Sequence, residues 1–100
     1  MNDNRKLALK VDGKDNVATV FSLGVSAGNE IEVRCRSGES RFLRARSAIP
    51  YGHKIALTEI PLAGHVIKYG EVIGAASETI QAGDYVHVHN MKALRGRGDL

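Results

Sequence analysis

The stretch that decides the fold is residues 49–90, IPYGHKIALTEIPLAGHVIKYGEVIGAASETIQAGDYVHVHN. Short apolar runs alternate in it with turn residues, and glycine or proline recurs at positions 50, 52, 61, 64, 70, 74 and 83. Both residues weaken helices and mark corners between strands. Because this punctuation leaves no room for a long helix, the stretch predicts a compact, mostly β structure of short strands and tight turns.

Two segments nearer the N-terminus also have strand patterns. Residues 7–11 alternate large apolar side chains with Ala8 and Lys10, and the following Asp12-Gly13 predicts a turn. Residues 30–36 alternate more regularly before a turn at Ser37-Gly38. One predicted face of this second strand carries Ile31, Val33 and Cys35, and the other carries Glu32, Arg34 and Arg36. The pattern makes Cys35 a small core residue and not a reactive thiol.

Between these strands, residues 17–23 are predicted to form one short helix. Asp15 or Asn16 could cap its N-terminus, and Gly24 stands where a helix C-terminus commonly needs a left-handed residue. Val17, Thr19 and Val20 are β-branched, which lowers the helix propensity of this segment. No internal repeat is apparent along the chain.

The chain ends in MKALRGRGDL, residues 91–100, which lacks apolar periodicity and has glycines beside its arginines. We expect one domain over residues 1–90 and a linker or docking tail over residues 91–100. A chain of 100 residues with 43% hydrophobic content can sustain one core, and a closed catalytic cleft is hard to build at this length. Size alone therefore makes a partner plausible.

A formal charge of +3 favours anionic partners only weakly. Arginine clusters between residues 34 and 46, which is typical of a solvated charged face, with a nucleic-acid surface as the alternative. Five aromatic residues and no Trp give little material for base stacking, so we expect no nucleic acid. The single cysteine, the absence of a signal-peptide pattern and the absence of a long apolar window predict a cytoplasmic protein outside the membrane.

The sharpest chemical feature is Val86-His87-Val88-His89-Asn90. In a strand, Val86 and Val88 would point to one face and both imidazoles to the other, with the histidine Cα atoms about 6.6 Å apart. Two such side chains could hold one metal ion, although a complete site needs further ligands. A pair of solvated surface histidines is the alternative interpretation.

Other candidates lie near glycine corners. His53 precedes Lys54, which places a titratable ring beside a cation that could hold a carboxylate. His65 is best explained as a loop histidine, and residues 68–71, KYGE, as a polar corner with anion binding as the alternative. The sequence contains no Ser-His-Asp arrangement, no phosphate-cradling Gly-rich loop and no CxxC pair, so nothing supports nucleotide hydrolysis or a zinc finger.

Four blocks together resemble the N-terminal domain of the altronate and galactarate dehydratase family. They are residues 15–19, DNVAT; 49–57, IPYGHKIAL; 66–74, VIKYGEVIG; and 82–90, AGDYVHVHN. The resemblance spans residues 15–90, with residues 24–48 showing no family pattern. It implies an SAF-type domain of the β-clip class, either as a separate small subunit or as part of a longer protein.

The resemblance also implies a function. Members of the family remove water from sugar acids with a divalent metal, typically Fe²⁺ or Mn²⁺, and the related sulfolactate sulfo-lyase eliminates sulfite. We therefore expect part of a carbon–oxygen hydro-lyase that is inactive alone and forms its active site with a large catalytic subunit or a C-terminal catalytic region. The expected metal ligands are His53, His87 and His89, and the expected contacts to the sugar acid are Lys54 and Asn90. No catalytic residue is assigned.

Three alternatives stay open. The chain could be the small subunit of a sulfolactate sulfo-lyase, or a binding module that holds carbohydrate or protein without a metal, as other SAF domains do. A nucleic-acid-binding protein is the third. A homodimer through an exposed strand edge is a further expectation.

Overall fold

The computed structural model describes residues 5–94, and these form nine strands and no helix. The mostly β prediction is therefore confirmed, and no helix of these residues is long and apolar enough to cross a membrane. The strands are β1 (Lys6–Lys10), β2 (Val17–Val20), β3 (Glu30–Cys35), β4 (Ser40–Arg44), β5 (Lys54–Ala56), β6 (His65–Lys68), β7 (Glu71–Ala76), β8 (Tyr85–Val86) and β9 (Met91–Ala93).

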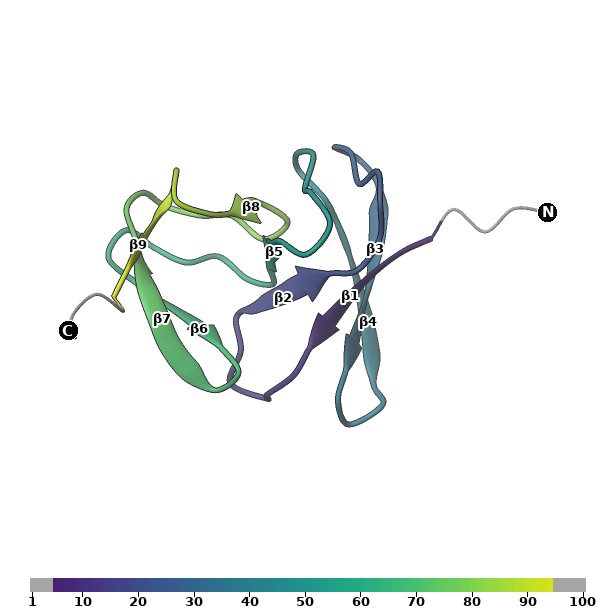
Figure 1. Cartoon of the computed structure of the whole chain (residues 1–100), viewed down its shortest axis with the longest axis horizontal. Coiled ribbons are helices and arrows are strands. Elements are labelled where there is room, and N and C mark those ends of the chain that lie inside the picture. Colours follow the sequence, from purple (N-terminus) through teal and green to yellow (C-terminus); the bar gives the residue numbers. More distant parts are fainter. Residues whose placement is uncertain (1–4, 95–100) are drawn as a thin grey trace.

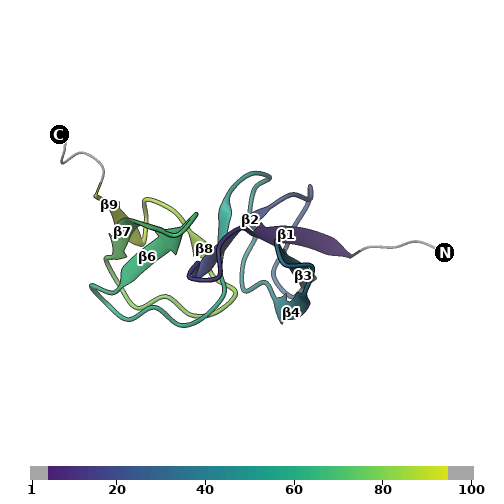
Figure 2. The ribbon, with the colours of Figure 1, turned by 90° about the horizontal axis from the view of Figure 1, so that it is seen from below.

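The strands form two sheets. Six strands pair in the order β4-β3-β1-β2-β5-β8, and three pair in the order β6-β7-β9. Only β1 and β3 run parallel, and the other pairs are antiparallel. Strands β1, β3 and β4 gather at one end of the molecule and β6, β7 and β9 at the other, with β2 between them (Figures 1 and 2).

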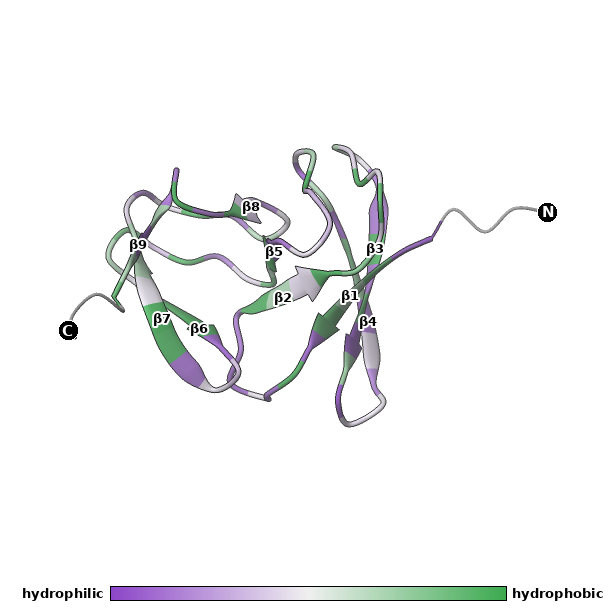
Figure 3. Cartoon of the chain, in the orientation of Figure 1, coloured by the Kyte–Doolittle hydropathy of each residue, from purple (hydrophilic) through white to green (hydrophobic). Residues whose placement is uncertain are grey.

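Two apolar clusters make up the core, and β2 and β5 contribute to both. Ala18 and Ile55 belong to the cluster under β1 and β3, whereas Val17 and Ala56 belong to the cluster under β6 and β7. Apolar residues accordingly run along β2 in the middle of the ribbon, while the β6–β7 turn is polar (Figure 3). Because both faces of β2 are covered, all four of its residues are buried.

The predicted helix over residues 17–23 is wrong. Val17–Val20 pairs with β1 on one side and β5 on the other. Val17, Thr19 and Val20 are β-branched, which favours a pleated surface packed on both faces over a helix. Pairing with β1 and β5 therefore determined the conformation of Val17–Val20, although the residues around this segment could also have capped a helix.

A recurring corner builds the fold, although no repeat is apparent in the sequence. Four seven-residue segments share apolar first and last residues and a fourth residue with positive φ, and all eight apolar ends are buried. In each, the amide of the fifth residue donates to the carbonyl of the second, and a strand begins at the sixth. The corners are 25–31 (VSAGNEI), 49–55 (IPYGHKI), 60–66 (IPLAGHV) and 80–86 (IQAGDYV).

The four corners form two pairs, each joined by an antiparallel bridge. The first residues of corners one and two, Val25 and Ile49, form an antiparallel bridge, and so do Ile60 and Ile80 of corners three and four. Only the two apolar ends and the fourth position are shared among the four segments, which is too little for a repeat to be seen in the sequence. Each of the two core clusters therefore contains the apolar ends of one pair of corners.

Asp15 and Asn16, the predicted helix caps, instead tie the two halves together. The Asn16 side chain donates to the carbonyl of His65 and accepts from the amide of Ile67. The buried Asp15 carboxylate accepts from the amides of Asp12 and Gly70. These bonds fix the β6–β7 hairpin against the loop that enters β2.

On the outer face of β3, Glu32 is buried instead of exposed as predicted. Its carboxylate accepts hydrogen bonds from Arg5, Arg34 and Ser40, and those hydrogen bonds, Ser40 first and then Arg5, hold its pKa below the usual range. Four of the five arginines of residues 34–46 also bind within the chain: Arg34 to Glu32, Arg41 to the Leu57 carbonyl, Arg44 to the Gly28 carbonyl and Arg46 to Asp84. These contacts give the arginine cluster a structural role.

Two further expectations differ from the structure in detail. Cys35 is half-buried and belongs to neither core cluster, because it lies at the last position of β3, beyond the packed interior. Residues 91–93, assigned to the tail, form β9 and pair with β7. The part of that tail from residue 95 onward lies outside the described residues.

Candidate functional site

Corner two can carry a histidine at its fifth position because its second residue, three positions earlier, is a proline. In corners one and four the second residue has an amide, and the side chain of the fifth residue, Asn29 or Asp84, accepts from it. In corner two the second residue is Pro50, which has no N–H to satisfy. The fifth position therefore needs no acceptor side chain, and it carries the imidazole of His53.

Strand pairing brings His53 to His87. Lys54 lies opposite Val86, and Ile55 opposite Tyr85, in the antiparallel pair β5–β8. One residue further along this register, His53 faces His87, and their ring centroids lie 4.9 Å apart. Two residues that are distant in sequence thus become cross-strand neighbours.

Tyr85 is the centre of the site. Its hydroxyl lies 2.8 Å from Nδ1 of His53, and its ring stacks on His87 with an interplanar angle of 10° and a centroid distance of 5.7 Å. The ring of His89 lies 5.2 Å from the same phenol. We call His53, Tyr85, His87 and His89 the histidine cluster.

The sequence analysis missed Tyr85. A signal was present, because Tyr85 stands two residues before His87 and alternate residues of a strand share a face. Its ring is half-buried against the cluster that contains Ile55. Tyr85 therefore links the packed interior to the three histidines.

The His87–Asn90 segment is a turn, so the predicted strand alternation is wrong. Strand β8 ends at Val86, and Val88 is 74% exposed while Val86 is fully buried. The Asn90 side chain holds the turn by accepting from the amide of His87 and donating to the carbonyl of Tyr85. Asn90 is only 3% exposed, and both ends of its amide are engaged in the turn.

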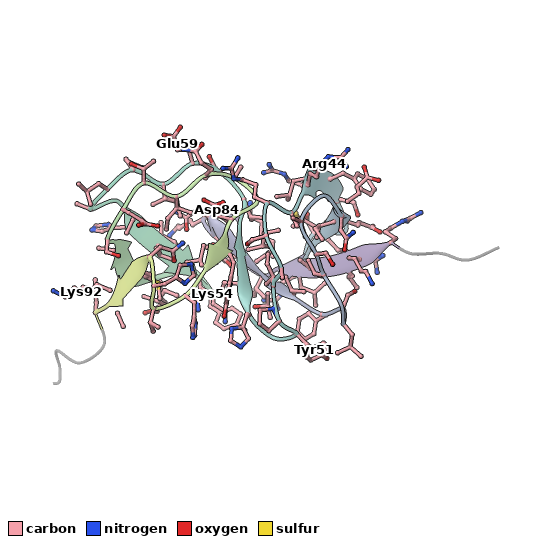
Figure 4. The ribbon with its side chains drawn as sticks, turned by 90° about the horizontal axis from the view of Figure 1, so that it is seen from above. Arg44, Tyr51, Lys54, Glu59, Asp84 and Lys92 are labelled. Carbon is pink, nitrogen blue, oxygen red and sulfur yellow. The ribbon has the colours of Figure 1, made fainter. Side chains whose placement is uncertain are left out.

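Lys54 is a partly desolvated cation beside the histidine cluster. Burial, and then the charge of Lys68 on β6, lowers the pKa of Lys54. No ion pair found in the described part of the chain involves either lysine. Lys54 lies on the same side of the molecule as Tyr51 and opposite Glu59 and Arg44 (Figure 4). An unpaired, partly buried ammonium group is suited to bind a carboxylate or another anion.

His87 is held toward its neutral form. Desolvation is the largest cause of its lowered pKa, followed by the charges of His53, Lys54 and His89. A neutral imidazole near pH 7 can accept a proton or coordinate a metal. Positive and titratable groups thus gather at one place, which is suited to a substrate with negative charge.

The three predicted metal ligands do not form a set by themselves. Within residues 5–94, no group of three or more His, Cys, Asp or Glu side chains is placed to hold a metal ion. His53 and His87 contact each other, whereas the ring contact of His89 is to Tyr85. The donors of the described residues alone do not make up a complete divalent-metal site, which takes at least three protein ligands.

The remaining candidates take structural positions. His65 is exposed at the start of β6, and its carbonyl accepts from Asn16. Lys68 and Glu71 lie opposite each other in the antiparallel pairing of β6 with β7. The Lys68 ammonium lies 4.9 Å from the centre of the Tyr69 ring. The polar corner predicted at residues 68–71 is a hairpin turn.

The match to a known protein family includes nearly all of the described residues. Residues 6–94 match the family described as altronate/galactarate dehydratase SAF domain. Altronate dehydratase of Escherichia coli is 37% identical over 84 residues, and galactarate dehydratase (L-threo-forming) of the same organism is 40% identical over 79 residues. These matches take in 84% and 78% of this chain but only 16% and 14% of the two dehydratases.

A third relative is of similar size to this chain. The (2R)-sulfolactate sulfo-lyase subunit alpha of Chromohalobacter salexigens is 37% identical over 86 residues, which is 84% of this chain and 90% of that subunit. The same kind of domain thus occurs as a small part of two dehydratases and as nearly the whole of a lyase subunit. The family match extends over both sheets and every residue of the histidine cluster, and the chain belongs to the altronate/galactarate dehydratase SAF domain family.

Proposed function

We propose that this chain is the SAF part of a lyase acting on a hydroxy acid, and that it supplies one wall of an active site completed by a larger catalytic region. The observation that carries the proposal is the gathering of His53, Tyr85 and His87 in mutual ring contact beside Lys54. Titratable groups next to a cation that forms no ion pair within residues 5–94 can hold a carboxylate and move a proton close to it.

The chemistry of a dehydratase suits these groups. A base removes the proton α to the carboxylate, the β-hydroxyl leaves as water after it receives a proton, and the enol that forms becomes a 2-keto-3-deoxy acid. In the proposal, Lys54 binds the carboxylate and offsets the negative charge that develops beside it. His87 and the His53–Tyr85 pair lie where a proton can be accepted or delivered, while the base belongs to the larger region.

The metal, expected to be Fe²⁺ or Mn²⁺, stays a prediction. Because residues 5–94 contain no set of three ligands, most of the coordination would come from the larger region and at most His53 and His87 from this chain. When bound, such an ion would stabilise negative charge on the substrate. The roles given to the residues of this chain do not depend on it.

A second candidate is the small subunit of a sulfolactate sulfo-lyase. It is favoured by coverage, because the match takes in 90% of one such subunit. The two candidates differ chemically, since a leaving hydroxyl must be protonated whereas sulfite leaves as a stable anion. A substrate panel therefore separates them directly.

The test is a turnover assay of the complete enzyme, with this chain and its catalytic region together. Aldonates and aldarates are tested for 2-keto-3-deoxy acid with ferrous or manganous ion, and sulfolactate is tested for sulfite. Lys54→Gln should raise KM for the preferred acid by at least tenfold, as expected when about 1.4 kcal/mol of binding is lost. The exposed Lys92→Gln should leave KM unchanged. No turnover on any acid, or equal effects of the two variants, would overturn the proposal.

A further inference from the structure

Three large apolar side chains stand exposed on the β2–β3 and β4–β5 connections, the second of which also carries His53. Phe21, Leu23 and Tyr51 are 42%, 75% and 54% exposed, and we call them the apolar rim. Phe21 and Tyr51 contact each other edge to face, with ring centroids 5.8 Å apart. Scattered exposed apolar residues are normal on a protein surface, but a cluster beside a polar site is typical of an interface.

The rim is attached rigidly to the site. Val20 donates to the carbonyl of His53 and accepts from the amide of Gly52, so the turn that carries Tyr51 and His53 is fixed to the end of β2, where Phe21 follows. The β2–β3 and β4–β5 connections lie at the same edge of the molecule as the β8–β9 turn (Figure 1). Any protein covering the rim would therefore lie against His53.

The histidine cluster has an exposed apolar residue of its own. Val88, between His87 and His89, is 74% exposed at the tip of the turn. An interface that excludes water needs apolar contacts around its polar centre. Exposed apolar groups in both turns that carry the histidines meet this requirement.

From this placement we infer that the apolar rim, together with Val88, is the surface on which the larger catalytic region of the same enzyme docks. The inference rests on the proposed function and names the position of its partner. This occupant is favoured over a second copy of the chain because the proposed reaction takes its base and most of its metal ligands from the catalytic region, and residues 5–94 hold no set of three such ligands. In the two dehydratases the domain is 16% and 14% of the chain, so each carries a large further region.

Docking on the rim has a chemical consequence. Covering Tyr51 and Val88 would remove water from both sides of the cluster and strengthen the interaction of Lys54 with an anionic substrate, because charges attract more strongly when solvent is excluded. The partly desolvated Lys54 would become fully desolvated only in the assembled enzyme. On this arrangement the domain would be inactive alone and required in the whole enzyme.

Hydroxyl-radical footprinting of the complete enzyme tests the inference without any mutation. Tyr51 and Tyr69 are exposed to similar extents in this domain, 54% and 57%, so they form a matched pair. We expect Tyr51 to be several-fold less reactive than Tyr69 in the assembled enzyme. Equal reactivity would overturn the inference.

Paired variants give a second measurement. Leu23→Ser with Tyr51→Ser should weaken the association of the domain with the catalytic region by at least tenfold, as loss of an interface anchor does. The control is Leu62→Ser with Phe42→Ser, since Leu62 occupies in corner three the position that Tyr51 occupies in corner two, and Phe42 lies on β4. Equal effects of the two pairs would also overturn the inference.

The outcomes separate docking from lyase activity. Protection of Tyr51 in an enzyme that turns over no acid would leave the docking surface standing and remove the proposed function. Turnover with an unprotected Tyr51 would do the reverse. Protection that persists in a sample of this chain without the catalytic region, together with the mass of a dimer, would assign the rim to a second copy and refute the inference.

Discussion

The hydroxyl of Tyr85 and Nδ1 of His53 lie 2.8 Å apart, and this hydrogen bond joins two corners of the fold that are 32 residues apart in the sequence. His53 comes from the turn before β5 and Tyr85 from β8. The hydroxyl either donates to a bare Nδ1 or accepts from a protonated one, so this hydrogen bond couples the tautomer of a neutral His53 ring to the orientation of the hydroxyl. Tyr85 thus orients His53 chemically as well as sterically.

Tyr85→Phe should remove the hydrogen bond that orients the His53 ring. The phenyl ring keeps the stacking on His87, so the loss is confined to one hydrogen bond, and the free energy of unfolding should decrease by about 1 kcal/mol. Nitrogen-15 NMR of the imidazoles should show a change in the His53 ring shifts. Tyr69→Phe, on an exposed turn, is the control. Unchanged His53 ring shifts in Tyr85→Phe would refute the orienting role.

Asn90→Ala should destabilise the turn that carries His87 and His89. The buried amide both accepts from His87 and donates to Tyr85, and leaving such backbone groups unsatisfied costs about 1–3 kcal/mol. Asn90→Asp keeps the acceptor for the His87 amide but loses the donor, so it should lie between the wild type and Asn90→Ala in chemical denaturation.

The same variants test the earlier expectation that Asn90 contacts substrate. A turn-holding role predicts that kcat and stability decrease together in the order Asp, then Ala. A rise in KM alone, with the free energy of unfolding unchanged, would instead support direct substrate binding.

Acidification should reduce stability through His87. The pKa of His87 is lowered in the folded state by burial and by its positive neighbours, so the unfolded chain binds the proton first as the pH decreases. The contribution of neutral His87 is complete above the unfolded pKa of about 6.5 and decreases as the pH falls from there through the lower folded pKa.

His87→Gln should remove this part of the pH dependence and flatten the unfolding free energy below about pH 6.5. His65→Gln is the matched control, because His65 is exposed and lies outside the cluster. Denaturant unfolding at a series of pH values measures the effect. The same slope in wild type and His87→Gln would show that another group is responsible.

The residues of the site differ in how well the sequence predicted their positions. The glycine and proline spacing of residues 49–90 correctly indicated short strands, because those residues act locally on the backbone. The grouping of His53 with His87 depends on the β5–β8 register, which no local pattern reveals. The same limit explains β2, whose burial between β1 and β5 overrode a plausible helix cap. Pairing of distant segments, more than local propensity, decided what the sequence left open.

The four corners allow a quantitative test of the backbone, and it starts from Gly28 and Gly83. Both have positive φ at the fourth position, +92° and +93°. A Cβ on Gly28 would meet nothing within 4 Å, so Gly28→Ala should cost about 1 kcal/mol from backbone strain, partly offset by the lower entropy of the unfolded chain. A Cβ on Gly83 would collide with the carbonyl oxygen of Arg44, and the forced shift should add about 1–3 kcal/mol.

Corner three gives the opposite substitution. Its fourth residue, Ala63, has φ of +70°, a conformation that costs an L-residue roughly 1–2 kcal/mol, while glycine loses about 0.5–1 kcal/mol of chain entropy there. Ala63→Gly should therefore stabilise the fold by up to about 1 kcal/mol. Thermal and denaturant unfolding should rank the proteins Ala63→Gly, wild type, Gly28→Ala and Gly83→Ala, from most to least stable. If Gly83→Ala unfolded no more easily than Gly28→Ala, the close approach of corner four to Arg44 would not be a constraint on the fold.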